Sequence, residues 1–291
     1  LIKRVARFTY ATDMLGDVVS KAALPNDVVL AKQQGRHSLY FTGNGVPLTQ
    51  QWHSIPDELR YLKIFFQLGI RMMHLTYQRR NMIGDGCAEK ANAGLSDFGR
   101  AVIAEMNRVG VIPDCAHSGW QTSLEAAQVS EKPVVASHTT CGKLFPHIRS
   151  KPDEVIKAIA DTGGYVGICC ISRFLRGEGN INALLDHVDH VVKTVGVDHV
   201  TLGTDVAYTS QNAAAENKKI PSRPGRRREF RSLWPADNFR AAAGASRSIA
   251  WTNWPLFTVG LVQRGHSDDD IRKIIGGNVL RVARVSLGLK A

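Results

Sequence analysis

The chain of 291 residues carries 37 Lys and Arg against 26 Asp and Glu, a formal net charge of +11, with 44% hydrophobic and 22% charged residues. This composition excludes an intrinsically disordered chain. No uninterrupted apolar stretch reaches the roughly 20 residues of a membrane-spanning helix, so we expect no transmembrane segment. The length allows one large domain to bury its core without disulfide bonds, and residues 1–291 are predicted to form a single domain.

The cysteines and the first residues of the chain give expectations about its cellular location and processing. The five cysteines are odd in number and lie mostly in apolar runs, which favours free thiols in a reducing compartment and predicts a cytoplasmic location. The chain begins at Leu1, without an initiator Met or a signal-peptide pattern. We therefore expect that a segment has been removed or that the sequence is a fragment.

More than half of the net charge lies in one segment. Between Lys218 and Arg231 there are seven basic residues and one acid, Glu229, so this stretch supplies +6 of the +11. We expect a solvated basic loop at about residues 211–236 that carries a substrate or subunit contact. Contact with RNA or an anionic surface is the alternative, but we expect no nucleic-acid partner.

Short apolar runs alternate with helical patterns along the chain. Runs of strand length cover residues 38–42, 70–76, 111–116, 133–138, 165–170 and 199–205. Each run but the last precedes a predicted helix, and the helix-start signals stand at Ser54, Ser96, Thr122 and Pro152. The clearest helical period covers residues 181–195, and a last helix is expected to begin at Ser267.

This alternation predicts βα units with a parallel sheet. A doubly wound sheet and a (βα)₈ barrel both satisfy it. No GxGxxG or GxxxxGK[ST] motif follows any of the six runs, so the nucleotide-binding form of the doubly wound fold lacks its signature.

Polar residues follow several of the predicted strands. His117, His138 and Asp205 stand at three strand ends, where a barrel fold places its chemistry. Neutral imidazoles are common zinc ligands, and a nearby carboxylate can act as a ligand or as a general acid or base. A single histidine at a strand end is more often structural, but two on consecutive strands with a later aspartate indicate a metal site.

The chain also resembles the renal or membrane dipeptidase family of zinc metallopeptidases, from residue 35 to about 210 and again from 265 to 285. The resemblance rests on residues 95–100 (LSDFGR), 105–110 (EMNRVG), 114–117 (DCAH), 133–138 (PVVASH), 186–190 (DHVDH), 203–205 (GTD) and 277–282 (GNVLRV). It implies a (βα)₈ TIM-barrel-like metallohydrolase with a two-metal site. In that family the residues matching His117 and His138 bind one zinc, the one matching Asp205 carries a proton, and the one matching Arg149 holds the substrate carboxylate.

Three departures from the family pattern follow from the same resemblance. The family's first strand, which carries a His-x-Asp ligand pair, and its second strand are expected to be missing, so the six predicted strands would be strands three to eight. The family's bridging glutamate corresponds to Asn44, an amide that would bind a metal only weakly and is a doubtful ligand. A substrate-binding histidine corresponds to Tyr77. A complete chain of this kind would expose sheet edges, and the start at Leu1 favours a fragment.

The resemblance therefore predicts a metal-dependent dipeptidase that uses one or two zinc ions, with the second ion doubtful. Water activated on zinc would attack the peptide carbonyl of a small dipeptide, Asp205 would move the proton, and Arg149 and Tyr77 would bind the substrate. A homodimer is expected. The alternative hypothesis is a metal-poor, inactive barrel that binds a ligand or another protein, and it is motivated by Asn44, Tyr77 and the absent His-x-Asp pair.

Overall fold

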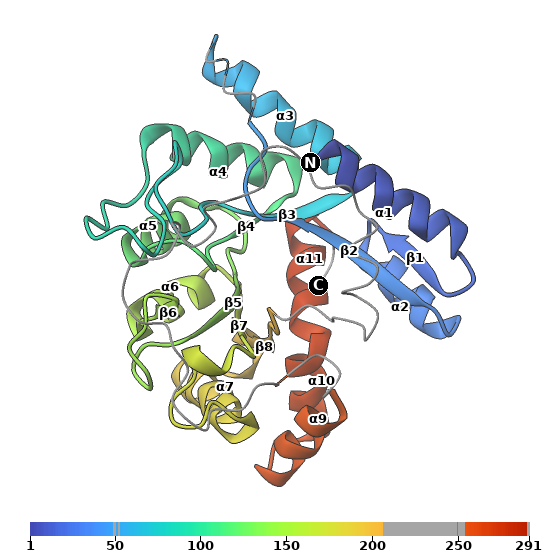
Figure 1. Cartoon of the computed structure of the whole chain (residues 1–291), viewed down its shortest axis with the longest axis vertical. Helices are drawn as coiled ribbons and strands as arrows, with labels where there is room; N and C mark the ends of the chain where they lie inside the picture. The colour runs from blue at the N-terminus through green and yellow to red at the C-terminus, as the bar shows by residue number, and fades with distance from the viewer. Residues whose placement is uncertain (49–50, 52, 206–248, 250–253, 290–291) are drawn as a thin grey trace, which may run out of the picture.

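The computed structural model describes residues 1–48, 51, 53–205, 249 and 254–289. Strands and helices alternate through most of this part of the chain (Figure 1). The strands are β1 (Val19–Ala22), β2 (His37–Gly43), β3 (Ile70–His74), β4 (Ile112–Asp114), β5 (Ala136–Cys141), β6 (Ser150–Lys151), β7 (Val166–Ile168) and β8 (Val200–Leu202). The helices are α1 (Ile2–Met14), α2 (Pro25–Gln33), α3 (Ile55–Gln67), α4 (Asp97–Val109), α5 (Trp120–Val129), α6 (Asp153–Asp161), α7 (Ile181–Val195), α9 (Trp254–Gln263), α10 (Asp268–Arg272) and α11 (Asn278–Ser286).

The strands form two parallel sheets in the orders β1-β2-β3-β4 and β6-β5-β7-β8. A parallel bridge between Asp114 and Val135 connects β4 to the residue before β5. Figure 1 shows the strands curving around α11, with α3 to α7 on the outer side. The parallel α/β architecture of a TIM-barrel-like fold is thus confirmed, and the doubly wound alternative is wrong.

Each of the six predicted strands overlaps a strand of the structure, but two strands, β1 and the two-residue β6, were not predicted. β1 pairs in parallel with β2, in register from Val19 opposite His37. The prediction that no strand of the barrel precedes β2 is therefore wrong. The physical reason is that β1 has only four residues, of which two are Ser20 and Lys21 and only Ala22 is buried, so its sequence shows no apolar run.

Most predicted helix starts are confirmed by their caps. The hydroxyl groups of Ser54, Ser96 and Ser267 each accept a hydrogen bond from the backbone three residues later, at the starts of α3, α4 and α10. The start predicted at Thr122 is wrong, because α5 begins at Trp120. The Thr122 hydroxyl instead exchanges hydrogen bonds with the backbone N–H and C=O of Asp85, so it ties a loop to α5 rather than capping the helix.

The last helix closes one end of the barrel interior. Val282 and Ala283 of α11 pack in one buried cluster with residues from four strands or their flanks, namely Met72, Ile112, Val135 and Tyr165. Because this end of the barrel is filled by apolar side chains, the polar strand ends lie at the opposite end.

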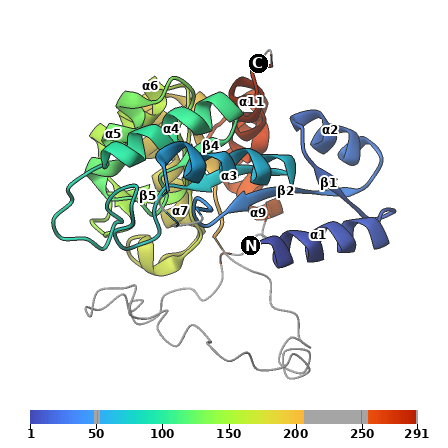
Figure 2. The same cartoon turned by 90° about the horizontal axis from the view of Figure 1, so that it is seen from above.

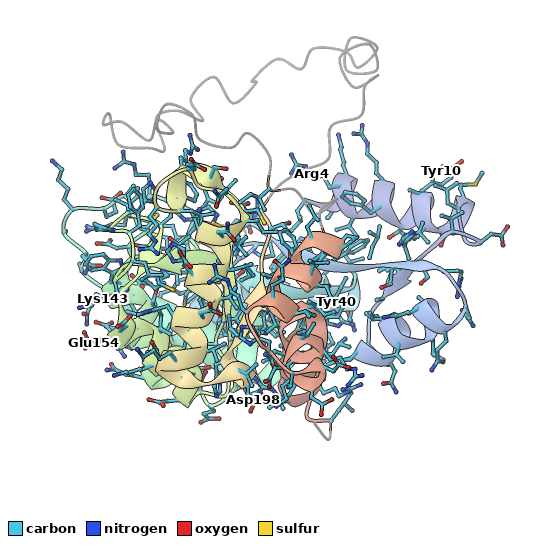
Figure 3. The ribbon with its side chains drawn as sticks, turned by 90° about the horizontal axis from the view of Figure 1, so that it is seen from below. Arg4, Tyr10, Tyr40, Lys143, Glu154 and Asp198 are labelled. Atoms are coloured by element: carbon cyan, nitrogen blue, oxygen red, sulfur yellow. The ribbon has the colours of Figure 1, made fainter. Side chains whose placement is uncertain are left out.

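The N-terminal elements lie at one side of the molecule. Figure 2 shows α1, α2 and β1 at the side opposite α5 and α6. Only Val5 and Thr12 of α1 are buried, and Figure 3 labels two exposed residues of this helix, Arg4 and Tyr10. No helix among the described residues is long and apolar enough to cross a membrane. The basic loop predicted at 211–236 lies outside the described residues.

Candidate metal centre

Five polar side chains gather at the carboxyl ends of the central strands. His74 and Asp114 are the last residues of β3 and β4, and His138 lies within β5. His117 follows β4 by three residues and Asp205 follows β8 by three. Neighbouring parallel strands end at the same edge, so residues distant in sequence meet in one place.

The two histidines predicted as metal ligands are in contact. His117 Nε2 and His138 Nε2 are 3.0 Å apart. Burial, followed by the positive charge of Arg149, lowers the pKa of His117 and of His138 well below the usual range. Both rings are therefore neutral at physiological pH, which is the state that binds metal ions.

Hydrogen bonds on the other ring nitrogens decide where the protons sit. His117 Nδ1 is 3.2 Å from the Gln78 Oε1, which can only accept, so Nδ1 carries the proton. His138 Nδ1 is 2.8 Å from the Ser137 hydroxyl oxygen, and that hydroxyl donates its own proton to Asp114. Each Nε2 thus carries a lone pair, and the two lone pairs face each other. A cation between them would turn this repulsion into attraction.

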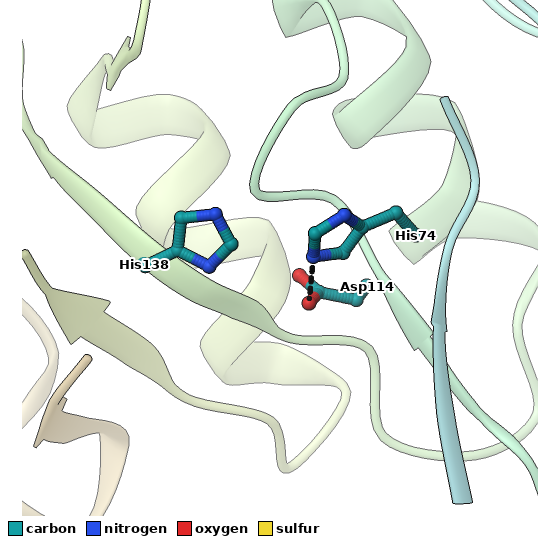
Figure 4. A group of neighbouring side chains, drawn as sticks. All are labelled: His74, Asp114 and His138. Atoms are coloured by element: carbon teal, nitrogen blue, oxygen red, sulfur yellow. Dashed lines mark ion pairs between the residues drawn. The ribbon is translucent and has the colours of Figure 1, made fainter. Parts of the chain in front are cut away.

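A third histidine lies against this pair. The His74 ring centroid is 5.0 Å from that of His117 and 5.1 Å from that of His138. His74 Nε2 is 2.9 Å from Asp114 Oδ2, and the two face His138 in Figure 4. One ligand atom each from His74, Asp114 and His138 lies within 4.8 Å of the others.

Asp114 connects the group. Its Oδ1 accepts hydrogen bonds from the backbone N–H of Ala116 at 2.9 Å and of Ser137 at 3.0 Å. Burial by itself raises the pKa of a carboxyl group, but the electrostatic interaction and hydrogen bond with His74, followed by His138 and the Ser137 hydroxyl, outweigh it and hold the pKa of Asp114 well below its usual range. Asp114 is therefore a fixed negative charge beneath the histidines.

Asp205 and Arg149 lie beside His138. Asp205 Oδ1 is 3.9 Å from His138 Nε2, and partial burial raises the pKa of Asp205. Its backbone φ of +54° is in the left-handed region that non-glycine residues seldom adopt. Arg149 is 1% exposed, and its guanidinium donates to the carbonyl oxygen of His138 at 2.9 Å.

The other two predicted site residues lie in different places. The Tyr77 ring stacks on His117 with its centroid 4.2 Å away, so it lies within the group. Asn44 follows β2 and lines a cavity together with Arg4 and Phe8 of α1. Its role as a weak metal ligand stays a prediction.

Sequence reasoning missed three members of the group. His74 and Asp114 stand at the ends of β3 and β4 but were given no role, although the criterion applied to His138 also fits His74. Gln78 offered no comparable signal, because its contact with His117 depends on a loop in which Gln78 itself adopts a φ of +53°.

Comparison with known proteins identifies the family. The family model for membrane dipeptidase, peptidase family M19, matches residues 18–218. The chain belongs to this family.

Two dipeptidases and one solved structure are also similar to this chain. The chain is 26% identical to dipeptidase tcpJ of Claviceps purpurea over 277 residues, which is 94% of this chain and 56% of that protein. It is 28% identical to dipeptidase verJ of Clonostachys rogersoniana over 233 residues, 79% of this chain and 52% of that protein. The chain spans about half the length of these curated relatives. A crystal structure of an amidohydrolase from Pseudomonas aeruginosa superposes with a TM-score of 0.78 at 30% identity and covers 99% of this chain and 84% of that one.

Membership in a metallopeptidase family implies dependence on a metal ion, and the residues present fit one. The facing lone pairs of His117 and His138 are a donor set for a divalent ion of the zinc type. Asp114 supplies negative charge close by. Two imidazole donors with a nearby carboxylate are the kind of ligands that a metal-dependent hydrolase uses.

Proposed function

We propose that this chain is a metal-dependent dipeptidase, with zinc as its metal, that hydrolyses the amide bond of small dipeptides. The observation that carries the proposal is the pair of unprotonated Nε2 atoms of His117 and His138, 3.0 Å apart, with the Asp205 carboxylate 3.9 Å from one of them. When bound, zinc would lower the pKa of a water molecule and polarise the substrate carbonyl.

The chain's own residues account for the rest of the reaction. Asp205 lies where it can accept a proton from the attacking water and give it to the leaving amine, and its raised pKa suits a group that must hold the proton between these steps. Arg149 supplies a permanent positive charge for the free carboxylate of the substrate. Tyr77, stacked on His117, would line the substrate side of the pair.

The test measures zinc content and hydrolysis together. Zinc-reconstituted protein is assayed with a panel of dipeptides by release of free amino acids. We expect turnover that is lost in Asp205→Asn and retained in the matched control Asp161→Asn, a substitution at the exposed end of α6. Folded, zinc-loaded protein that cleaves no dipeptide would reject the proposal and favour a ligand-binding barrel.

We also propose a cytoplasmic location and a homodimer. All five cysteines are free, and four of them are buried, which supports a reducing compartment. Cell fractionation and light scattering in solution check these two proposals.

A further inference from the structure

The oxygen of the Gln78 side chain lies within reach of two hydrogen-bond donors. His117 Nδ1 is 3.2 Å from Gln78 Oε1, and the thiol of Cys87 donates to the same oxygen at 2.8 Å. Gln78 is 0% exposed, and its Nε2 atom is buried with no hydrogen-bond partner among the described residues. The orientation of this amide is therefore decided at its oxygen end, by His117 and Cys87.

Backbone contacts hold Cys87 between the other two residues. The Cys87 N–H donates to the carbonyl oxygen of His117 at 2.9 Å, and the N–H of Ala88 donates to the carbonyl oxygen of Gln78 at 2.8 Å. Gly86 passes so close to Gln78 that a Cβ on Gly86 would lie 2.2 Å from the Gln78 carbonyl carbon. The backbone thus fixes the position from which the Cys87 thiol reaches Gln78 Oε1.

The orientation of the Gln78 amide decides which nitrogen of His117 can bind a metal ion. If the amide turned by half a rotation, Nε2 of Gln78 would face His117 Nδ1, and this group can only donate. His117 Nδ1 would then have to accept, and the ring proton would move to Nε2, which would lose the lone pair that a metal needs. The Cys87 thiol opposes this reversal, because it donates its proton to Oε1 and its sulfur is only a weak acceptor for an amide N–H.

We propose that Cys87 is a positioning residue of the metal centre, which acts through Gln78 to keep the proton of His117 on Nδ1 and the lone pair on Nε2. The inference rests on the proposed function only in taking His117 as a metal ligand. Cys87 has no contact with metal or substrate in this role. The residue that orients a ligating histidine contributes about 10–100-fold to metal affinity, and here that residue, Gln78, is itself held in its orientation by a thiol.

Nitrogen NMR of the metal-free protein at neutral pH tests the inference without reference to turnover, because a protonated and an unprotonated ring nitrogen differ in chemical shift. We expect His117 of the unmodified protein to carry its proton on Nδ1. Cys87→Ala removes the thiol, so part of the His117 population should carry the proton on Nε2, and zinc binding should weaken by about tenfold in calorimetric titration. Cys87→Ser supplies a hydroxyl that can donate to the same oxygen, and it should restore both the tautomer and the zinc affinity.

The matched control is Cys141→Ala, which alters a buried cysteine whose thiol contacts the carbonyl oxygen of His187 instead. It should leave the tautomer of His117 and the zinc affinity unchanged. A proton on Nε2 of His117 in the unmodified protein would overturn the inference, and this measurement needs no variant to fold. An unchanged tautomer in Cys87→Ala, or an equal loss of zinc affinity in Cys87→Ala and Cys87→Ser, would also overturn it. A tautomer that depends on Cys87 in a protein that cleaves no dipeptide would leave the inference standing and reject the proposed function.

Discussion

Replacing His187 by asparagine should remove the contribution of one buried histidine to the pH dependence of folding stability. His187 lies on α7 and is 0% exposed. Its Nδ1 accepts a hydrogen bond from the backbone N–H of Cys141 at 3.0 Å. A second proton on the ring would point an N–H at that donor, and the charge would be buried. Burial, followed by the charges of His190 and Arg176, therefore lowers the pKa of His187 to about 4.

The pKa shift of His187 fixes the sign and size of the change in the free energy of unfolding with pH. Above pH 6.5, the ordinary value, His187 is neutral in both the folded and the unfolded chain, and its stabilising contribution is complete. Between pH 6.5 and about 4 the unfolded chain binds a proton that the folded chain excludes, so the free energy of unfolding falls as the pH falls. A shift from 6.5 to about 4 is worth about 3 kcal/mol at 1.36 kcal/mol per pH unit.

Urea unfolding at a series of pH values between 4 and 7.5 measures this term. Asparagine is chosen because its Oδ1 can accept the Cys141 hydrogen bond but does not titrate. Any packing loss in His187→Asn is independent of pH, so the comparison at pH 7.5 is the internal control. We expect the stability difference between the two proteins to shift by about 3 kcal/mol in favour of the variant on going to pH 4. Parallel pH profiles would refute the reasoning.

Three further substitutions test the site. Gln78→Leu removes the hydrogen-bond acceptor of His117 Nδ1 and should weaken zinc binding about 10–100-fold, as measured by calorimetric titration. An unchanged zinc affinity would contradict the role of Gln78 in orienting His117. Gly203→Ala would place a Cβ 1.9 Å from the Ser137 carbonyl oxygen, so urea unfolding should show a loss of about 1–3 kcal/mol. The control Gly45→Ala, with nothing within 4 Å, should show almost none. Arg149→Lys should lower kcat/KM for a dipeptide but not for its C-terminal amide, and an equal loss for both substrates would argue against a carboxylate contact.

The barrel strands were predictable because most of them are apolar on both faces. β3 is buried at every residue from Ile70 to His74, and β7 and β8 are buried throughout. Strands covered by helices read as continuous apolar runs. β1 is the exception, since it pairs with β2 alone in the described sheet and is mostly half-buried, so its composition carries little of that signal.

The site was predictable only in part, because strand ends show position but not partners. His117, His138 and Asp205 were identified from their places at the ends of three predicted strands. The tautomers of the two histidines depend on Gln78 and Ser137. Gln78 and His117 are 39 residues apart in sequence, and their contact requires a left-handed backbone conformation at Gln78. No local sequence pattern predicts such a contact.

The alternation of side chains along β3 and β4 explains why His74 and Asp114 lie together at the polar end of the barrel. On β3 and β4, Met72 pairs with Ile112 and His74 pairs with Asp114. Residues two apart on a strand point to the same side, so His74 and Asp114 stand one layer above Met72 and Ile112, which pack against α11 in the apolar cluster. We call this apolar cluster the barrel floor; its side chains are buried and leave a water-poor environment beneath the histidines.

A low local dielectric has two consequences for the site. It strengthens the repulsion between the facing lone pairs of His117 and His138 when no cation is present, and it strengthens their attraction to a cation when one is bound. The packing of α11 against the barrel floor, about 6 to 7 Å below the His74 layer at roughly 3.3 Å per strand residue, therefore contributes to metal affinity without supplying a ligand. The sequence pattern of an apolar residue followed two positions later by a polar one, Met72 then His74 and Ile112 then Asp114, marks that boundary on both strands.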